Sequence, residues 1–401
     1  MAPTRSNAWI EVDLDALASN ARVLRSSLAP GVALGVLVKA NGYGHGLVMP
    51  ARAALAGGAD ALIVATLDEG LALRAAGLEG RILLVYPVPR DGVGDAAAAD
   101  LEPSVSGLAS ARDTLAGWAG SLAAGTGGRL RIHVEIDSGM GRGGVPPSGL
   151  ADLLREVDAA DGVELAGLWS HLADGRDGAR SGEQARRFAA AVEAASEGGR
   201  PAPMRHLVAS EGLLAVSAPA HDMVRIGLAF YGEVGLGFTP SPEMTPVARS
   251  LRPALALKAR PVRIETLEPG DAVGYGGEWV AERPSTVATL PVGYADGWAR
   301  SSWPGASALV RGHRVRLIGR VSMDSVCADV TDAEGVTLHD EVVLIGAQGD
   351  DRITVNEIAE LRGTIPNEVL SSLGSRLPRH YHEGGRRVAV GTRTELVDSG
   401  H

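Results

Sequence analysis

The feature that most constrains the fold is a regular alternation of segments between residues 33 and 228. Short runs rich in Leu, Val and Ile alternate there with Ala-rich segments of helical length, such as GLADLLREVDAA and EQARRFAAAVEAA. Repeated βα units of this kind are typical of a parallel sheet covered by helices. Eight such units in about 200 residues favour a closed (β/α)8 barrel over an open doubly wound sheet. The expected strands lie near residues 34–38, 61–65, 82–85, 102–105, 131–136, 165–169, 205–208 and 224–228.

A second domain of different character follows the barrel. The segment GFTPSPEMTPVARSLRP is dense in Pro and Ser, which is typical of an exposed linker and places a boundary near residue 240. Beyond it, strand-like runs such as ALALKARPVRIETL and STVATLPVGYA are separated by Gly-rich turns, with one helical stretch around VNEIAELRG. We therefore expect an α/β protein with a barrel over residues 1–240 and a mostly-β domain over 241–401. Residues 1–12 can pack with this second domain.

Charge and cysteine content exclude several classes of protein. The chain has 38 Lys and Arg against 48 Asp and Glu, a net charge of −10, and no basic run, which argues against a nucleic-acid partner. No apolar stretch is long enough to span a membrane, and the start MAPTRSNAWIEVDLDAL lacks the apolar core of a secretory signal. The single cysteine, Cys327, cannot form an internal disulfide. These features predict a cytoplasmic protein that binds neither nucleic acid nor membranes.

The first candidate for chemistry is the lysine of GVLVKANGYGHG. Lys39 closes an apolar strand and is followed by three closely spaced glycines. The C-terminal ends of barrel strands form the catalytic mouth, where a partly desolvated lysine has a lowered pKa and can form a Schiff base with an aldehyde. A surface cap at the end of the strand explains the same residue, but the glycines favour close approach of a ligand.

Three further strand ends carry polar residues. Arg142, on the Gly-rich loop of HVEIDSGMGRGG, suits a carboxylate, although a solvated arginine in a turn explains it equally. His171 ends the strand in LWSHLADG, where a histidine satisfied at the rim is the structural alternative. Ser210, in HLVASEG, begins a helix and can hold phosphate or simply cap that helix.

The eighth strand, in HDMVRIGLAFYG, carries Arg225 and is followed by Gly227. An arginine that points into a barrel is costly unless it meets an acceptor such as a ring nitrogen or a carboxylate. Barrels commonly bind phosphate with the loops after strands seven and eight, which suits Ser210 and Gly227. Because all these strand ends converge on one mouth, they indicate a phosphate-bearing aldehyde cofactor on Lys39.

The chain as a whole resembles the alanine racemase family, pyridoxal-phosphate enzymes with a barrel followed by a β domain. The resemblance extends over essentially the full length. The matching motifs, in the family's order, are VKANGYGHG, DSGMGRGG, the strand ending at His171, RIGLAFYG, VGYGG, TLPVGYADG, GRVSMDSV and RLPRHY. The resemblance implies an isomerase that interconverts L- and D-alanine, with pyridoxal 5'-phosphate as cofactor and no metal.

The resemblance also implies a two-base mechanism. Lys39 matches the lysine that holds the cofactor and acts as one base, and Tyr275 matches the second base, delivered by the partner subunit of a head-to-tail homodimer. Two bases allow one proton to leave one face of the α-carbon and another to return to the opposite face. A tyrosine, with a pKa near 10, needs positive charge nearby, which the matching residues His171 and Arg225 could supply.

Other positions match by the same resemblance. Arg225 corresponds to the residue that meets the pyridine nitrogen, and an arginine there donates a hydrogen bond without giving up its proton, which disfavours transamination. Arg142 and the partner's Met323 match the site for the substrate carboxylate. The residues that match the phosphate surroundings are Tyr43, Ser210 and Gly227, and those that match the entrance are Tyr294 and Arg300.

Two positions depart from the family pattern. Glu135 stands where a lysine, often carbamylated, is common, and it carries the same negative charge toward Arg142 on a shorter stem. Asn367, in GTIPNEVL, stands where a tyrosine is usual near the phosphate and the substrate side chain. A carboxamide in place of a phenol opens volume and adds a donor and an acceptor for a hydroxyl. A serine or mixed alanine and serine racemase is therefore the alternative.

Two other classes share the barrel and the cofactor. A non-catalytic pyridoxal-phosphate carrier lacks the β domain, whereas Tyr275 and Met323 are present here. A decarboxylase of basic amino acids is disfavoured by the motifs GYADG and MD. The expectation is thus a racemase acting on a small amino acid.

Overall fold

The chain forms two units, as seen in a computed structural model that describes residues 6–125, 128–196 and 203–391. The barrel unit comprises Leu17–Gly42 and Leu47–Arg252. The β unit comprises Met1–Ala16, Tyr43–Gly46 and Pro253–His401. The expected boundary near residue 240 falls inside the barrel unit, because the following helix α10 (Thr245–Ser250) belongs to that unit.

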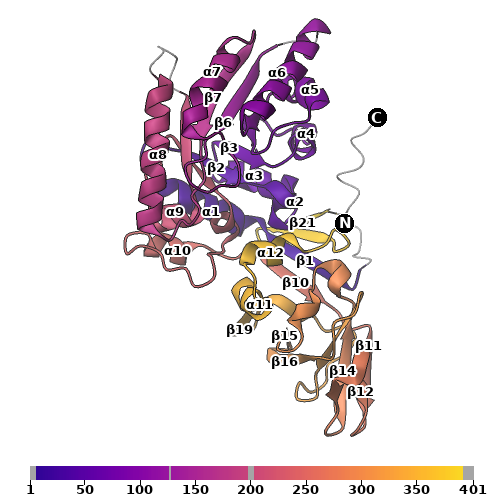
Figure 1. Ribbon diagram of the computed structural model, residues 1–401. Coiled ribbons are helices and arrows are strands. Elements are labelled where there is room, and N and C mark those ends of the chain that lie inside the picture. The colour runs from indigo at the N-terminus through magenta and orange to yellow at the C-terminus, as the bar shows by residue number, and fades with distance from the viewer. Residues whose placement is uncertain (1–5, 126–127, 197–202, 392–401) are drawn as a thin grey trace. The chain divides into compact units, whose positions relative to one another are not determined.

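Eight parallel strands close the barrel, which confirms the fold class expected from the sequence. Each strand pairs with its successor, and β2 pairs with β9 to complete the ring (Figure 1). All residues of β3 and β9 are buried, as expected for strands covered on both faces. The barrel strands are β2 (Ala33–Leu37), β3 (Ala61–Val64), β4 (Arg81–Leu84), β5 (Leu101–Val105), β6 (Leu130–Glu135), β7 (Val163–Trp169), β8 (Met204–Ala209) and β9 (Met223–Ile226).

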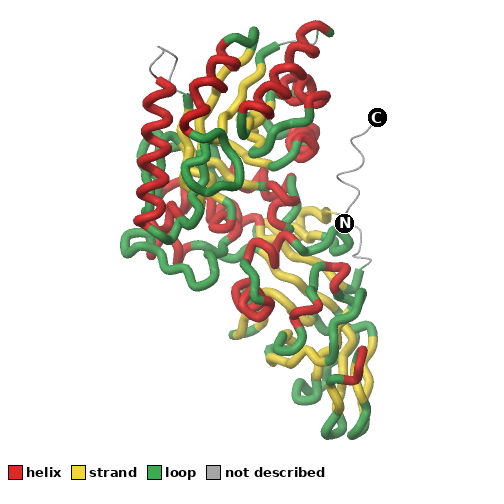
Figure 2. The backbone as a smooth tube through the Cα atoms, viewed as in Figure 1, coloured by secondary structure: helices red, strands yellow, loops and turns green. Residues whose placement is uncertain are grey.

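Helices cover the outside of the barrel (Figure 2). In α7, Leu150, Leu153, Leu154 and Val157 are buried, a spacing that places them on one face toward the strands. The helices of this region are α1 (Leu14–Ser26), α2 (Lys39–Tyr43), α3 (Val48–Ala56), α4 (Leu67–Ala75), α5 (Val93–Ala98), α6 (Leu108–Ala123), α7 (Leu150–Asp158), α8 (Gly178–Ser196), α9 (Ser210–Ala215) and α10. Short 3-10 turns lie at Arg90–Gly92, Pro147–Gly149 and Leu228–Tyr231.

The β unit is built on an eleven-stranded sheet. Its N-terminal strand β1 (Ala8–Asp13) lies between β10 and β20, antiparallel to the first and parallel to the second. The remaining strands are β10 (Leu255–Ala259), β11 (Arg263–Leu267), β14 (Ser285–Leu290), β15 (Ser307–Val310), β16 (His313–Ile318), β17 (Val326–Asp329), β18 (Val342–Gln348), β19 (Asp351–Ile353), β20 (Arg379–Glu383) and β21 (Arg386–Gly391). The unit also contains the hairpin β12 (Ala272–Val273) with β13 (Trp279–Val280), the helices α11 (Val355–Arg362) and α12 (Pro366–Ser371), and 3-10 turns at Tyr275–Gly277, Tyr294–Asp296 and Arg300–Ser302.

Polar residues interrupt the apolar interior of the barrel. Glu102, His133 and His206 are at most 1% exposed, and Arg225 is 3% exposed. Barrel interiors are usually filled by branched aliphatic side chains, so buried ionisable groups there require partners. Within the described parts of the chain, no helix is long and apolar enough to cross a membrane.

Candidate active site

The barrel gathers one group of the residues predicted from the sequence. These residues lie in, or directly after, the C-terminal parts of four strands, β2, β6, β8 and β9, and beyond the end of β7. The C-terminal ends of parallel strands meet at one mouth of the barrel, so the group shares a single site. Its members are Lys39, Glu135, Arg142, His171, Ser210, Arg225 and Gly227.

Lys39 follows β2 and is half-buried. Burial lowers the pKa of its amine, and the positive charges of Arg142 and Arg225 lower it further, while Glu69 opposes them. A lowered pKa increases the neutral fraction of the amine, which is the form that attacks an aldehyde. The lowered pKa is compatible with the Schiff-base role, which stays a prediction for Lys39.

A left-handed turn follows Lys39 directly. Ala40, Asn41 and Gly42 have φ angles of 53°, 53° and 59°, and two of these residues carry a side chain, which makes that conformation costly. Glu69 of α4 stabilises the turn, because its Oε1 accepts the backbone N–H of Ala40 at 2.7 Å. Its Oε2 accepts the N–H of Ala65 at 2.9 Å, so one carboxylate joins two strand ends.

Sequence reasoning missed Glu69 as a site residue. The available signal was the capping box that begins α4, in which Glu69 stands three residues after the N-cap Thr66. That pattern identifies a helix start, but it does not reveal that the same carboxylate also reaches the turn after Lys39. The second role depends on the spatial proximity of β2 and β3, which pair in the barrel.

The loop that carries Arg142 is held by an aspartate. Asp137 Oδ1 accepts the backbone N–H groups of Gly139, Met140 and Gly141 at 2.9, 3.0 and 3.1 Å. Arg142 itself is exposed. The loop thus presents a guanidinium on a shaped backbone, which suits binding of a carboxylate.

Glu135 is buried beneath this loop. Ser106 donates a hydrogen bond to its Oε2 at 2.7 Å, and a Cβ added at Gly143 would lie 2.9 Å from the same oxygen. Burial raises the pKa of Glu135, whereas the bond from Ser106 and the charge of Arg142 lower it. Among the described residues no ion pair joins Glu135 to Arg142, so its effect on that arginine comes through its charge and through loop packing.

Arg225 points into the barrel and finds acceptors on nearly every side. Its Nη1 donates to His206 Nδ1 at 3.0 Å and to the His206 carbonyl at 2.9 Å, and its Nη2 donates to the Ser170 carbonyl at 2.7 Å. Its guanidinium also lies 4.9 Å from the centre of the Trp169 ring. Burial and Arg142 lower its pKa to about 10, so it stays charged at neutral pH. The described residues offer no acceptor to its Nε–H, which can donate to a ring nitrogen.

His171 is a neutral acceptor rather than a source of positive charge. Burial, followed by the charges of Arg225, Arg142 and Lys39, lowers its pKa to about 3. Its Nδ1 lies 3.3 Å from Arg225 Nη2 and accepts from it. The sequence-based expectation that His171 could supply positive charge is thus corrected.

Ser210 begins α9, as expected, and it organises the backbone after β9. Its Oγ accepts the N–H of Gly227 at 3.1 Å and that of Ala229 at 3.3 Å. A serine hydroxyl that accepts two bonds still has its own proton to donate. The arrangement is therefore compatible with a phosphate oxygen, for which Ser210 was predicted.

Tyr43 and Asn367 lie in the β unit and contact each other. The segment Tyr43–Gly46 belongs to this unit, where Arg379 Nε donates to the Gly44 carbonyl at 3.0 Å. Burial raises the pKa of Tyr43 to about 12, and a side-chain hydrogen bond with Asn367 opposes that rise. The unusual asparagine thus engages the phenol of Tyr43.

The other predicted residues of the β unit gather around the segment 319–324. Met323 accepts at its carbonyl from the N–H of Ala295, the residue after Tyr294, and Arg300 donates to the Val321 carbonyl at 3.3 Å. Tyr275, Met323 and Tyr294 are 67%, 53% and 43% exposed, although they are large hydrophobic side chains. Exposed large apolar side chains of this kind are common at protein interaction sites.

Comparison with known proteins identifies the class to which both units belong, an isomerase built from a barrel and a β domain. The family description "Alanine racemase, N-terminal domain" matches residues 12–234, and "Alanine racemase, C-terminal domain" matches residues 254–381. The chain belongs to the alanine racemase family.

Individual relatives agree over the full length. The alanine racemase of Symbiobacterium thermophilum is 41% identical over 95% of this chain and 97% of its own. Alanine racemase 2 of Caldanaerobacter subterraneus is 36% identical over 94% of this chain and 95% of its own. The crystal structure of alanine racemase from Bacillus anthracis with bound L-Ala-P has a TM-score of 0.89 at 33% identity and covers 98% of this chain and 99% of its own.

The role of Glu69 can be tested with Glu69→Ala. The change removes the carboxylate that accepts the backbone N–H of Ala40 in the turn after Lys39. Because a charged hydrogen-bond partner is lost, we expect kcat/KM for the racemisation of L-alanine to fall about tenfold or more. Asp68→Ala, at the preceding exposed residue of the same helix, is the matched control. Equal kcat/KM for the two variants would contradict the role of Glu69.

The buried histidines predict how stability depends on pH. His133, His171 and His206 all have pKa values lowered by burial, so the folded protein keeps them neutral while the unfolded chain protonates them below about pH 6.5. The free energy of unfolding should fall as the pH drops from 7 to 5.5, by up to about 1.4 kcal/mol per pH unit for each histidine.

Urea unfolding of the cofactor-free protein at the two pH values measures this loss. His313→Asn, at an exposed position, is the control and should leave the pH dependence unchanged. Equal free energies of unfolding at pH 7 and pH 5.5 would mean that the three histidines are not held neutral.

Proposed function

We propose that this chain interconverts L- and D-alanine with pyridoxal 5'-phosphate, in a homodimer whose active sites combine residues of both subunits. The observation that carries the proposal is the partly buried Lys39, whose pKa is lowered beside two arginines at the mouth of the barrel. A neutral amine there can bind an aldehyde, and the same amine can exchange a proton with the substrate. Lys39 is therefore both the residue that binds the cofactor aldehyde and the first base that exchanges a proton with the substrate.

The residues present fit the cofactor. Arg225 has an Nε–H that no described residue accepts, which suits a pyridine nitrogen, and Ser210 keeps a hydroxyl proton for a phosphate oxygen. When bound, pyridoxal phosphate stabilises the negative charge that develops at the α-carbon of the substrate. Arg225 would hold the ring by a hydrogen bond and would keep its own proton, since a guanidinium remains charged near neutral pH.

The substrate carboxylate would be bound by Arg142. The positive charges of Arg142, Arg225 and Lys39 attract an anionic group, and the Asp137 loop presents Arg142 toward solvent. His171 accepts from Arg225 and so orients that guanidinium without adding charge.

The second base would be Tyr275, supplied by the other subunit together with Met323. Inversion needs a proton donor on the face opposite Lys39, and the large exposed area of Tyr275 and Met323 is compatible with a surface that another chain covers. The phenol would give and take this proton at its Oη. Arg142 and Arg225 would provide the positive charge that favours the ionised phenol.

Shared sites can be tested with Lys39→Ala and Tyr275→Phe, each expected to abolish inversion when present in both subunits. In a heterodimer one site keeps both bases and the other has neither, so two differently tagged chains purified as a mixed dimer should recover about half of the wild-type rate. Each variant homodimer carried through the same tag purification is the control. A pure but inactive mixed dimer would contradict shared sites.

Asn367 makes serine racemisation the second candidate function. Its amide forms a hydrogen bond with the phenol of Tyr43, in a place where the family usually has another aromatic ring. We propose alanine as the preferred substrate, with serine as the competing substrate that Asn367 allows to bind.

Asn367→Tyr should lower kcat/KM for L-serine relative to L-alanine by about tenfold, because serine loses both a polar partner and the volume that its hydroxyl occupies. Chiral chromatography of both reactions measures this ratio, and Ser372→Ala at the C-cap of the same helix is the control, since its hydroxyl donates to the Val369 carbonyl. A ratio unchanged by Asn367→Tyr would remove Asn367 from substrate choice.

A further inference from the structure

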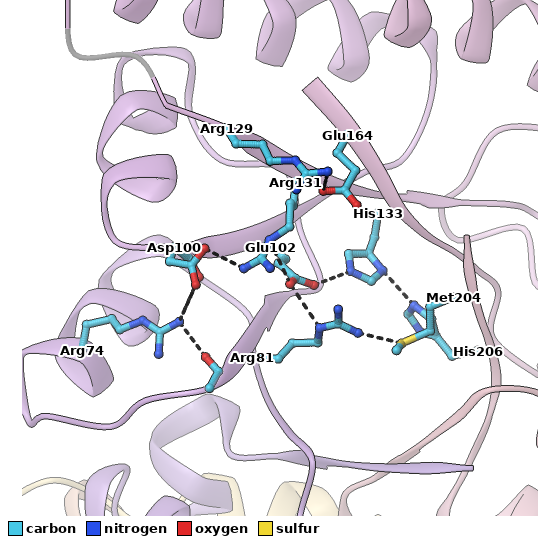
Figure 3. A network of polar contacts seen from close by, with 11 residues as sticks. Arg74, Arg81, Asp100, Glu102, Arg129, Arg131, His133, Glu164, Met204 and His206 are labelled. Atoms are coloured by element: carbon cyan, nitrogen blue, oxygen red, sulfur yellow. Dashed lines mark hydrogen bonds and ion pairs between the residues drawn. The ribbon is translucent and has the colours of Figure 1, made fainter. Parts of the chain in front are cut away.

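A chain of hydrogen bonds crosses the barrel interior and ends on Arg225. Glu102 Oε2 lies 2.8 Å from His133 Nε2, His133 Nδ1 lies 2.9 Å from His206 Nε2, and His206 Nδ1 lies 3.0 Å from Arg225 Nη1. Figure 3 shows the first three of these residues linked in sequence. The four residues of the chain, Arg225 included, come from β5, β6, β8 and β9, and none of them is more than 3% exposed.

Because a guanidinium can only donate, Arg225 allows each proton in this chain to be assigned. A guanidinium only donates, so His206 Nδ1 accepts and the proton of that neutral ring is on Nε2. His206 then donates to His133 Nδ1, which places the proton of His133 on Nε2. That proton is donated to Glu102, whose carboxylate accepts it. Both histidines are neutral in this arrangement, as expected since burial lowers both pKa values.

Two arginines keep Glu102 ionised at the far end. Arg81 Nε lies 3.1 Å from its Oε1, and Arg131 Nε lies 3.3 Å from the same oxygen (Figure 3). Burial alone would raise the pKa of Glu102, but the bond from His133 and these charges lower it overall. A protonated Glu102 would donate to His133 instead, and the direction of the whole chain would reverse.

A glycine allows the chain to pass strand β7. A Cβ added at Gly167 would overlap the His133 imidazole at Nδ1, the atom that accepts from His206. His133 reaches from β6 to β8 because no side chain stands between them. The link therefore depends on the glycine of β7, a strand that contributes no side chain of its own to the chain of hydrogen bonds.

We propose that Glu102 is a positioning residue of this active site: its carboxylate, through His133 and His206, sets the direction of the hydrogen bonds that hold Arg225 and leave the guanidinium Nε–H free for the cofactor ring. The inference rests on the proposed function, since the ring belongs to the pyridoxal phosphate assigned there. It extends the site from the mouth of the barrel to the opposite ends of the strands.

Reversal of the chain would turn two donors toward each other. If His133 donated to His206 Nε2, the remaining proton of His206 would lie on Nδ1 and would face Arg225 Nη1. A buried donor without an acceptor is unfavourable, so Arg225 would shift away from its present position. Glu102 thus acts on Arg225 across two imidazole rings.

The test compares Glu102→Gln with Asp100→Asn. Asp100 is the matched control, because it pairs with the same Arg131 at 2.6 Å, is largely exposed and has no contact with His133 among the described residues. The first measurement is the ¹⁵N spectrum of imidazole-labelled, cofactor-free protein. Wild type and Asp100→Asn should show His133 and His206 protonated on Nε2, whereas Glu102→Gln should show both rings moved toward the other tautomer.

The second measurement is the Kd for pyridoxal 5'-phosphate. Loss of a correctly placed Arg225 should raise it about tenfold in Glu102→Gln and leave it unchanged in Asp100→Asn. Should Glu102→Gln not fold, Glu102→Asp withdraws the carboxylate from His133 Nε2 by one methylene and should move the His133 tautomer in the same direction. Wild-type tautomers and Kd in Glu102→Gln, or in Glu102→Asp if that variant replaces it, overturn the proposal.

The two hypotheses fail in different ways. Absence of alanine inversion by the wild-type protein would overturn the proposed function, while the tautomers of the cofactor-free protein would still reveal whether Glu102 controls the chain. Normal inversion together with unchanged tautomers in Glu102→Gln would overturn only the role of Glu102.

Discussion

The structure depends on a permanent positive charge buried inside a barrel. A guanidinium cannot shed its proton near neutral pH, so Arg225 is tolerated only because carbonyls of β7 and β8 and imidazole nitrogens accept its N–H groups. The same requirement fixes the protonation of its neighbours. His171 and His206 must be neutral acceptors, and their lowered pKa values agree with that.

The charge of Arg225 also shapes the chemistry at Lys39. Arg142 and Arg225 lower the pKa of the lysine, and Glu69 limits that effect while it stabilises the turn that follows. A mouth with this excess of positive charge attracts a phosphate and a carboxylate. In the proposed function, one arrangement of cations both activates the amine and binds its anionic ligands.

The sequence predicted the barrel well because strands and helices alternate with a strong period, and all eight expected strands are present. Lys39, Ser210 and Arg225 were predicted from their places at strand ends, which the barrel brings to one mouth. Glu69 and Glu102 were not found, since their roles depend on which side chains meet across different strands. Gly167 was not predicted either. It matters because the imidazole of His133, on the neighbouring strand, lies where a side chain at position 167 would be.

Residues of the β unit presented a different difficulty. Nothing in the spacing around Tyr275 and Met323 predicts a second base or a substrate-binding residue, and only the family resemblance singled them out. The structure adds that both are exposed and that Gly274, the residue before Tyr275, lies beside Arg320 in the segment that carries Met323. The segment after Lys39 was also expected to serve the barrel, whereas Tyr43–Gly46 is part of the β unit, where Arg379 holds the Gly44 carbonyl.

Two bases on opposite faces of one carbon leave an isotopic signature that can be read directly. The decisive measurement is the hydrogen content at the α-carbon during the first turnovers of L-alanine in D2O, followed by mass spectrometry of the separated enantiomers. If Lys39 and a tyrosine act from opposite faces, newly formed D-alanine carries solvent deuterium while the remaining L-alanine keeps protium. D-Alanine that retains the original protium would mean that a single group carries the proton across, and would contradict the two-base account.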